Sequence, residues 1–219
     1  MKECCFCNDL EIHGANVEKI IPELQAKLVV AETPNMFAFA EAHPIVDEEY
    51  YLLTPKEHYQ AFSHLPTHFS RDMNGMIQYL TNGNEFIMFE HGELADKVKV
   101  KSVLHAHTHL ILTNNMLESV VEKTEELGAK PRYVHFDEYS TIDTLKDVVG
   151  DNGYFMFREG EHGFVIPEND VELPSQFFRM LVDDIKNPEV PFPDWKNPSE
   201  EDVLVFQKRL TNLKKEIKK

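Results

Sequence analysis

The sequence has few basic residues and no long hydrophobic run, and each shortage argues against a class of protein. It contains 22 lysines and arginines against 38 aspartates and glutamates, for a formal net charge of −16. A chain this acidic is not expected to bind nucleic-acid polymers or anionic membranes through its overall charge. Its apolar runs are far shorter than the roughly 20 residues that span a bilayer. We therefore predict neither a nucleic-acid partner nor a membrane association.

Cysteine is also scarce, and all three cysteines lie within the first seven residues. Such a cluster does not form a disulfide framework across the chain. The opening also lacks the apolar segment of a secretory signal peptide, so we expect a cytoplasmic protein. With 42% hydrophobic residues in 219, the chain can form one large domain or a core domain with an extension.

Cys4 and Cys7 form a C-x-x-C pair, with Cys5 inside it. This spacing suits a tetrahedral zinc site but supplies only two of the four ligands, so histidines would have to complete it. Unligated thiols are an alternative. A redox-active pair is a weaker one, because such pairs usually follow a strand and open a helix, and nothing strand-like precedes Cys4.

The segment Ser102–Leu112 contains three histidines, His105, His107 and His109, that alternate with small or apolar residues. On a β-strand these three side chains share one face. Imidazoles grouped in this way suit metal ligation, or acid–base and nucleophilic chemistry near neutral pH. Three solvent-facing histidines without a function are the remaining alternative.

Hydrophobic periodicity and turn residues predict a mixture of strands and helices. The strands are expected at residues 27–33, 36–41, 49–54, 85–89 and 102–112, with a hairpin of 154–157 and 163–166. Helices are expected at residues 66–82, 116–128 and 200–219, and from about 173 onward. The sequence therefore predicts an α+β fold.

The histidine stretch resembles the His-φ-His-φ-His-φ-φ pattern of the histidine-triad (HIT) family of nucleotide hydrolases and transferases, where φ is an apolar residue. Three further segments match family features in the same order. They are the Cys-x-Phe-Cys opening of zinc-containing members, a φ-φ-Pro-Lys-x-His strand end, and a Phe-Glu-His-Gly segment, at Cys4–Cys7, Leu53–His58 and Phe89–Gly92. The chain thus resembles the zinc-containing branch, in its larger bacterial form with a C-terminal extension.

This resemblance implies a HIT-like antiparallel sheet with flanking helices over residues 1–116, which would form the catalytic core. Residues 117–219 would form an α+β extension packed on that core. Family members commonly pair as two-fold dimers, which leaves a homodimer as an open alternative for this chain.

The resemblance also implies a mechanism. His107 would attack the α-phosphorus of a nucleotide and form a nucleotidyl-histidine intermediate. His109 would neutralise phosphate charge and assist the leaving group, and Ser102 would donate a hydrogen bond to a non-bridging oxygen. Contacts with the substrate are expected from two further groups of residues, Glu90, His91 and Gly92, and Ser175, Gln176 and Arg179. For Ser175, Gln176 and Arg179, the alternative to a substrate contact is a helix cap followed by a surface arginine.

For the metal, the resemblance assigns Cys4, Cys7, His58 and His105 as ligands of a structural zinc ion. A closed set of four leaves no open position for a catalytic water. The expected activity is hydrolysis of a phosphoanhydride or phosphoramidate of a nucleotide, such as a dinucleoside polyphosphate. The alternatives are nucleotidyl transfer to phosphate or a sugar phosphate, nucleotide binding without turnover, and a metallohydrolase with catalytic zinc on the three histidines.

Overall fold

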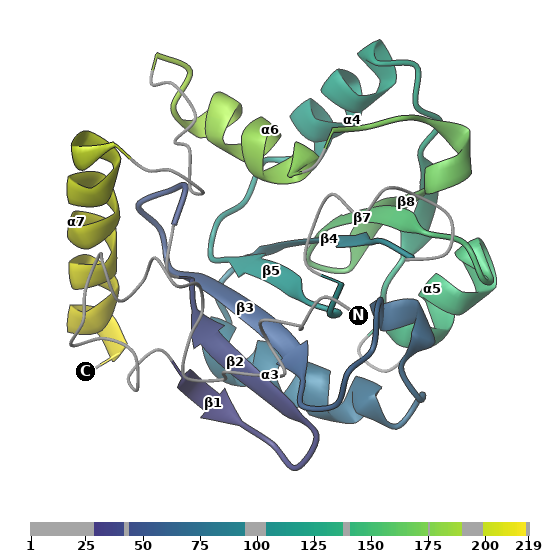
Figure 1. Cartoon of the computed structure of the whole chain (residues 1–219), viewed down its shortest axis with the longest axis horizontal. Coiled ribbons are helices and arrows are strands. Elements are labelled where there is room, and N and C mark those ends of the chain that lie inside the picture. The colour runs from purple at the N-terminus through teal and green to yellow at the C-terminus, as the bar shows by residue number, and fades with distance from the viewer. Residues whose placement is uncertain are drawn as a thin grey trace.

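The structure is a computed structural model that describes residues 29–41, 44–94, 104–137, 141–174, 176–189 and 199–217. These residues form one eight-stranded sheet with helices on both faces (Figure 1). All strand pairings in the sheet are antiparallel. The predicted α+β class is therefore confirmed.

The sheet order is β1-β2-β3-β5-β4-β7-β8-β6. The strands are β1 Val29–Glu32, β2 Met36–Ala40, β3 Tyr50–Pro55, β4 Ile87–Gly92, β5 Thr108–Ile111, β6 Arg132–His135, β7 Tyr154–Glu159 and β8 His162–Pro167. The predicted strands and the C-terminal hairpin are present, with ends that differ by a few residues, except that only Thr108–Ile111 of the strand expected at 102–112 forms a strand. Strand β6 was not predicted, and it is mostly exposed at the sheet edge, so it lacks a clear apolar face.

The longer helices are α3 Phe69–Thr81, α4 Leu117–Glu126, α5 Thr141–Val149, α6 Phe177–Lys186 and α7 Glu200–Ile217. Two short 3-10 turns, η2 Phe62–His64 and η3 Glu168–Asp170, complete the described structure. Helix α5 was not predicted, and its nine residues are too few to give a strong helical period. Within the described residues, no helix is both long and apolar enough to cross a membrane.

The C-terminal strands extend the same sheet that carries the histidines. Strand β7 pairs with β4 over six residues, from Ile87 opposite Glu159 to Gly92 opposite Tyr154. The chain after residue 116 therefore continues the hydrogen-bonded ladder of the core, and helices from both segments cover the sheet. The boundary proposed at residue 116 stays a prediction.

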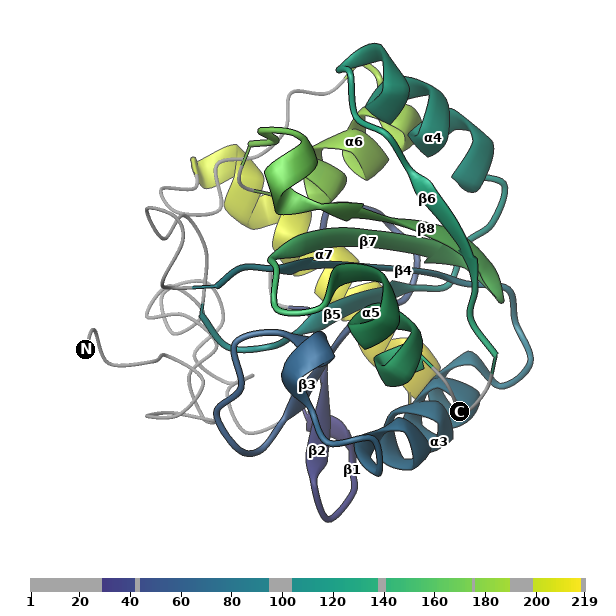
Figure 2. The same cartoon turned by 90° about the vertical axis from the view of Figure 1, so that its right-hand side faces the viewer.

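Two apolar layers enclose the sheet, with α3 and α5 on one side and α4 and α6 on the other (Figure 2). Alternation along β4 divides its side chains between these layers. Met88 packs toward α3 and α5, whereas Ile87 and Phe89 pack toward α4 and α6. The α4/α6 side of the sheet is the side that holds the candidate site.

Glu90 is a buried carboxyl group on the other side of β4. It accepts hydrogen bonds from the backbone N–H of Phe62, at 3.0 Å, and from the hydroxyl of Tyr154. Burial raises the pKa of the Glu90 carboxyl from 4.5 to about 8, against the lowering effect of these two hydrogen bonds. Glu90 is therefore mainly protonated in the folded protein at neutral pH.

This pKa makes the stability of the protein depend on pH in a defined direction. Because the folded-state pKa lies above the unfolded value, folding takes up a proton, and stability is lost as pH rises from about 4.5 to about 8. We expect the free energy of unfolding of the wild type to fall in this window by a few kcal/mol relative to Glu90→Gln, whose amide resembles the protonated acid.

The measurement is urea unfolding at several pH values for the wild type, Glu90→Gln and the exposed control Glu122→Gln. The pH profile of Glu122→Gln is expected to follow that of the wild type. It shows the effect of removing a carboxyl group that is not buried. Parallel pH profiles for the wild type and Glu90→Gln would contradict this assignment.

Candidate active site

The histidine stretch is not one continuous strand. Strand β5 begins only at Thr108, and the described residues just before it have no regular structure. The backbone of Ala106 is hydrogen-bonded to residues around the end of β3. Its N–H donates to the Tyr59 carbonyl at 2.6 Å, and its carbonyl accepts from the Thr54 hydroxyl at 2.8 Å. The predicted strand through all three histidines is therefore wrong, since these contacts replace ladder bonds.

The three histidines fall into two groups instead. The ring of His105 packs perpendicular to that of His58, with centroids 5.1 Å apart. The ring of His107 lies beside that of His109, with centroids 5.4 Å apart. One imidazole thus contacts another predicted zinc ligand, and the two predicted catalytic imidazoles lie side by side.

His107 is held in a defined tautomer. Its Nδ1 lies 2.8 Å from the carbonyl oxygen of His105. A carbonyl oxygen only accepts, so Nδ1 carries the proton and donates, and Nε2 keeps its lone pair. Burial lowers the pKa of His107, although the hydrogen bond to the His105 carbonyl partly opposes this. The ring is consequently neutral near pH 7, as a nucleophilic imidazole must be.

His109 lies on β5, between Leu52 of β3 and Phe89 of β4. Its ring stacks on Phe89 at 4.6 Å with an interplanar angle of 19°. Its Nδ1 is 2.7 Å from the hydroxyl of Tyr50. Burial lowers the pKa of His109 well below its ordinary value, and nearby positive charge on His107 or Arg179 lowers it further.

Arg179 reaches this region from α6, where it forms a buried ion pair with Glu41. Its Nη1 is 3.3 Å from Oε2 of Glu41, and both side chains are less than a tenth exposed. Its guanidinium lies 5.8 Å from the centroid of the Tyr50 ring. The burial excludes the alternative of a surface arginine. Neither Glu41 nor Tyr50 was predicted, because each follows an ordinary strand pattern and no motif marks it.

His91 lies on the same side of the sheet. Its ring stacks on Phe155 at 4.1 Å, and its Nε2 is 3.3 Å from Oε1 of Glu168. Gly153 leaves space for this carboxylate, because a Cβ at Gly153 would collide with the Glu168 side chain. A charge on His91 would lower the pKa of His107, so the two rings lie within electrostatic range of each other. The sequence pointed to His91 but not to Glu168.

The other predicted substrate contacts are placed differently. Glu90 is on the opposite side of β4. At Gly92, a Cβ would lie 2.7 Å from Cζ of Tyr154 and 3.0 Å from Cβ of Ala61, so the glycine makes room for core packing there. Gln176 directly precedes α6 with φ of 64°, and its Oε1 is buried without a hydrogen-bond partner in the described part of the chain. Ser102 and Ser175 lie outside the described residues.

His58 and His105 are the two predicted zinc ligands that the structure describes. Nε2 of His105 is 2.9 Å from the carbonyl oxygen of Pro55, so Nε2 carries the proton and Nδ1 keeps the lone pair. Burial lowers the pKa of His105 to about 4, which keeps the ring neutral as metal ligation requires. This pair fits half of a Cys2His2 site. Cys4 and Cys7 lie outside the described residues, among which no group of three potential ligands converges.

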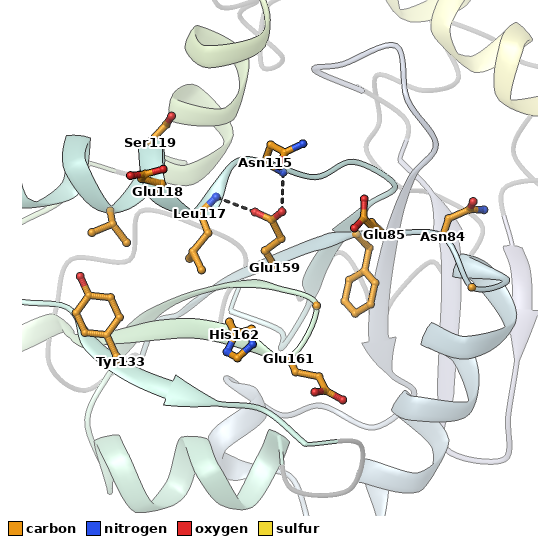
Figure 3. A pocket seen from close by; sticks show the side chains of 14 residues that line it. Asn84, Glu85, Asn115, Leu117, Glu118, Ser119, Tyr133, Glu159, Glu161 and His162 are labelled. Atoms are coloured by element: carbon orange, nitrogen blue, oxygen red, sulfur yellow. Dashed lines mark hydrogen bonds between the residues drawn. The ribbon is translucent and has the colours of Figure 1, made fainter.

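An open pocket of about 850 Å³ lies at the opposite end of β4 and β5, between the start of α4 and the β7–β8 turn (Figure 3). Its acidic lining consists of Glu85, Glu118, Glu159 and Glu161. The Glu159 carboxylate accepts hydrogen bonds from the backbone N–H groups of Asn115 and Leu117 (Figure 3), and so caps α4. None of the three histidines lines this pocket, and its carboxylates would repel a phosphate group.

Comparisons with known proteins give only distant similarities. No family model matches the sequence, and no curated protein is significantly similar to it. Yeast Ap4A phosphorylase in complex with AMP is 13% identical with a TM-score of 0.48, over 75% of this chain and 70% of that chain. The same enzyme in complex with Ap4A is 11% identical with a TM-score of 0.45, over 70% of this chain and 64% of that chain.

Two other solved structures are similar to parts of the fold. A DUF4931 family protein from Bacillus cereus is 12% identical with a TM-score of 0.42, over 84% of this chain and 99% of that chain. A hypothetical histidine triad nucleotide-binding protein from Sulfolobus tokodaii is 14% identical with a TM-score of 0.32, over 57% and 89% of the two chains. All four scores are below 0.5, so function has to be inferred from the site itself.

The Glu41–Arg179 pair gives a test of how the site is held together. We expect Arg179→Met to lower the free energy of unfolding by about 3–5 kcal/mol, because it leaves the Glu41 carboxylate buried without its cation. The double variant Glu41→Gln/Arg179→Met removes both charges and should recover most of this loss. Chemical denaturation of the wild type, Arg179→Met and the double variant measures the free energy of unfolding of each.

The matched control is Lys56→Met, which breaks the ion pair of Lys56 with the mostly exposed Glu32. This change should cost no more than about 1 kcal/mol. If the double variant were as unstable as Arg179→Met, the buried charge would not be the cause.

Proposed function

We propose that this protein is a HIT-family nucleotidyl hydrolase that acts through a covalent nucleotidyl-His107 intermediate. The substrate class is a nucleotide with a phosphoanhydride or phosphoramidate bond, such as a dinucleoside polyphosphate. One observation carries the proposal. His107 is a neutral imidazole whose Nδ1–H is bound to the His105 carbonyl at 2.8 Å, so its lone pair is on Nε2.

The reaction would proceed in two displacements at phosphorus. The lone pair on Nε2 of His107 attacks the α-phosphorus, the bond to the leaving oxygen breaks, and that oxygen departs with the electron pair and takes up a proton. The imidazole becomes cationic as the N–P bond forms, so its Nδ1–H hydrogen bond to the His105 carbonyl strengthens. Water then attacks phosphorus, gives up a proton, and returns the electron pair of the N–P bond to His107.

Several polar side chains on the α4/α6 side of the sheet support binding of the phosphate groups. His109 is beside His107, His91 is within electrostatic range of it, and Gln176 has a buried oxygen without a described partner. Arg179 supplies a buried positive charge whose field reaches both catalytic rings. Ser102 is proposed as a further donor to a non-bridging oxygen, from the family resemblance alone.

Trapping the covalent intermediate tests the nucleophile. A substrate labelled at the α-phosphorus is mixed with the enzyme and quenched without acid, because a phosphoramidate bond is acid-labile. We expect the label to remain on the wild-type chain and to be absent from His107→Asn, whose turnover should fall by a factor on the order of 10³ or more. His64→Asn, at an exposed histidine, is the control and should retain label and turnover.

Labelling of His107→Asn equal to the wild type would exclude His107 as the nucleophile, as would an unlabelled wild type during measured turnover. Adding inorganic phosphate in the same experiment separates the two kinds of acceptor. Faster release of a nucleoside diphosphate with phosphate present would make the protein a transferase that uses the same intermediate.

We also propose a structural zinc ion bound by Cys4, Cys7, His58 and His105. Its support is the contact between His58 and His105, together with the hydrogen bond from His105 to the Pro55 carbonyl, since zinc-bound imidazoles commonly donate their second N–H in this way. When bound, the metal would tie the start of the chain to the segment that carries His107 and leave the chemistry to the imidazoles.

Metal analysis tests this proposal. We expect about one zinc ion per chain in the wild type, and a loss of both zinc and thermal stability in His58→Ala, because structural zinc contributes directly to folding. His107→Asn is the control and should retain the metal and the fold. Loss of zinc from His107→Asn or His109→Ala would instead support a catalytic metal on the three histidines.

A further inference from the structure

We infer that Tyr50 is a positioning residue that holds His109 as the neutral tautomer with its proton on Nε2, and that the C-terminal segment holds Tyr50 in place through Arg179. The catalytic meaning of this inference rests on the proposed function. The tautomer itself is a property of the protein without substrate and is measurable separately.

The first step is the direction of the hydrogen bond between Tyr50 and His109. The two atoms, Oη of Tyr50 and Nδ1 of His109, are 2.7 Å apart. Tyr50 is fully buried, and in the described part of the chain its hydroxyl has no other hydrogen-bond partner. A buried hydroxyl that donates to nothing costs free energy. The hydroxyl therefore donates, Nδ1 of His109 accepts, and the ring proton is on Nε2.

The protonation states of both groups agree with this direction. Burial raises the pKa of the Tyr50 hydroxyl, so it keeps the proton that it donates. Burial lowers the pKa of His109, so its ring is neutral and has a lone pair to accept with. His109 is then a hydrogen-bond donor without a charge, which refines the charge-neutralising role that the family resemblance implied.

The second step is the set of contacts that fixes the two rings. The carbonyl of Tyr50 accepts a hydrogen bond from the backbone N–H of Glu41 at 2.8 Å, and the side chain of Glu41 binds Arg179. The guanidinium of Arg179 faces the Tyr50 ring, and the ring of His109 is stacked on Phe89. Helix α6, distant in sequence, thereby supports the orientation of a side chain on β5.

The consequence is that the two neighbouring imidazoles have opposite tautomers. His107 has its proton on Nδ1 and its lone pair on Nε2, whereas His109 has its lone pair on Nδ1 and its proton on Nε2. One ring is thus prepared to attack phosphorus, and the other is prepared to donate to an oxygen on phosphorus. Two identical residue types acquire different roles from the partner of one ring nitrogen.

Histidine tautomers are read directly from two-bond ¹H–¹⁵N correlations of the ¹⁵N-labelled full chain without substrate, with the His109 signals assigned by their loss in His109→Gln. We expect His109 in the wild type to be protonated on Nε2 alone. In Tyr50→Phe, Nδ1 of His109 loses its hydrogen-bond donor, so we expect a mixture of the two neutral tautomers of His109. Tyr51→Phe is the matched control, because Tyr51 is the next residue, is buried on the other face, and binds Glu49.

Steady-state kinetics separates positioning from stability. Tyr50→Phe is expected to lower kcat about tenfold, the effect of one misplaced hydrogen bond, with little change in KM, while Tyr51→Phe keeps the wild-type kcat. Equal losses of kcat in both variants would overturn the positioning role.

A wild-type His109 with its proton on Nδ1 would overturn the inference without any variant having to fold, and so would an unchanged tautomer in Tyr50→Phe. Failure to trap a nucleotide on His107, with the Nε2–H tautomer observed at His109, would overturn the proposed function and leave the tautomer assignment intact.

Discussion

The arrangement of the site depends on the backbone of Ala106. Its N–H and carbonyl bind the Tyr59 carbonyl and the Thr54 hydroxyl, so this residue is fixed to the chain at the end of β3 instead of pairing within β5. A regular strand would place the alternate histidines side by side. The irregular segment separates them, with His105 against His58 and His107 against His109. A single backbone connection thus divides one motif between the proposed zinc ligands and the proposed catalytic histidines.

Burial then decides what these imidazoles can do. Each described histidine of the motif has a pKa below its ordinary value, and in each case desolvation is the largest cause. Neutral imidazole is the form that attacks phosphorus and the form that binds zinc. Burial also makes each hydrogen bond costly to lose, so the tautomers set by the His105 carbonyl and the Tyr50 hydroxyl are strongly held. The buried charges of Glu41 and Arg179 form an ion pair in this region.

Much of the fold followed from residue patterns, and the misses have local causes. The strands and helices with clear periodicity were predicted, including α3, whose Phe69, Met73 and Leu80 form a buried stripe. Strand β6 and helix α5 were missed because one is mostly exposed and the other is short. Glu41, Tyr50 and Glu168 were missed because each takes its part in the site from partners distant in sequence. Glu90 looked like a substrate contact through its neighbour His91, but alternation along β4 sends the two side chains to opposite sides.

The sequence alone determined which chemical groups are present and in what order. It also determined the α+β class, because hydrophobic periodicity is a local property that the chain carries into any fold. The tertiary structure decided the pairing of His58 with His105, the arrival of Arg179 from α6, and the protonation and tautomer of each ring. These depend on desolvation and on single hydrogen bonds or ion pairs between residues up to 138 positions apart, as Glu41 and Arg179 are. No pattern of neighbouring residues encodes such contacts, since only packing of the whole chain brings the partners together.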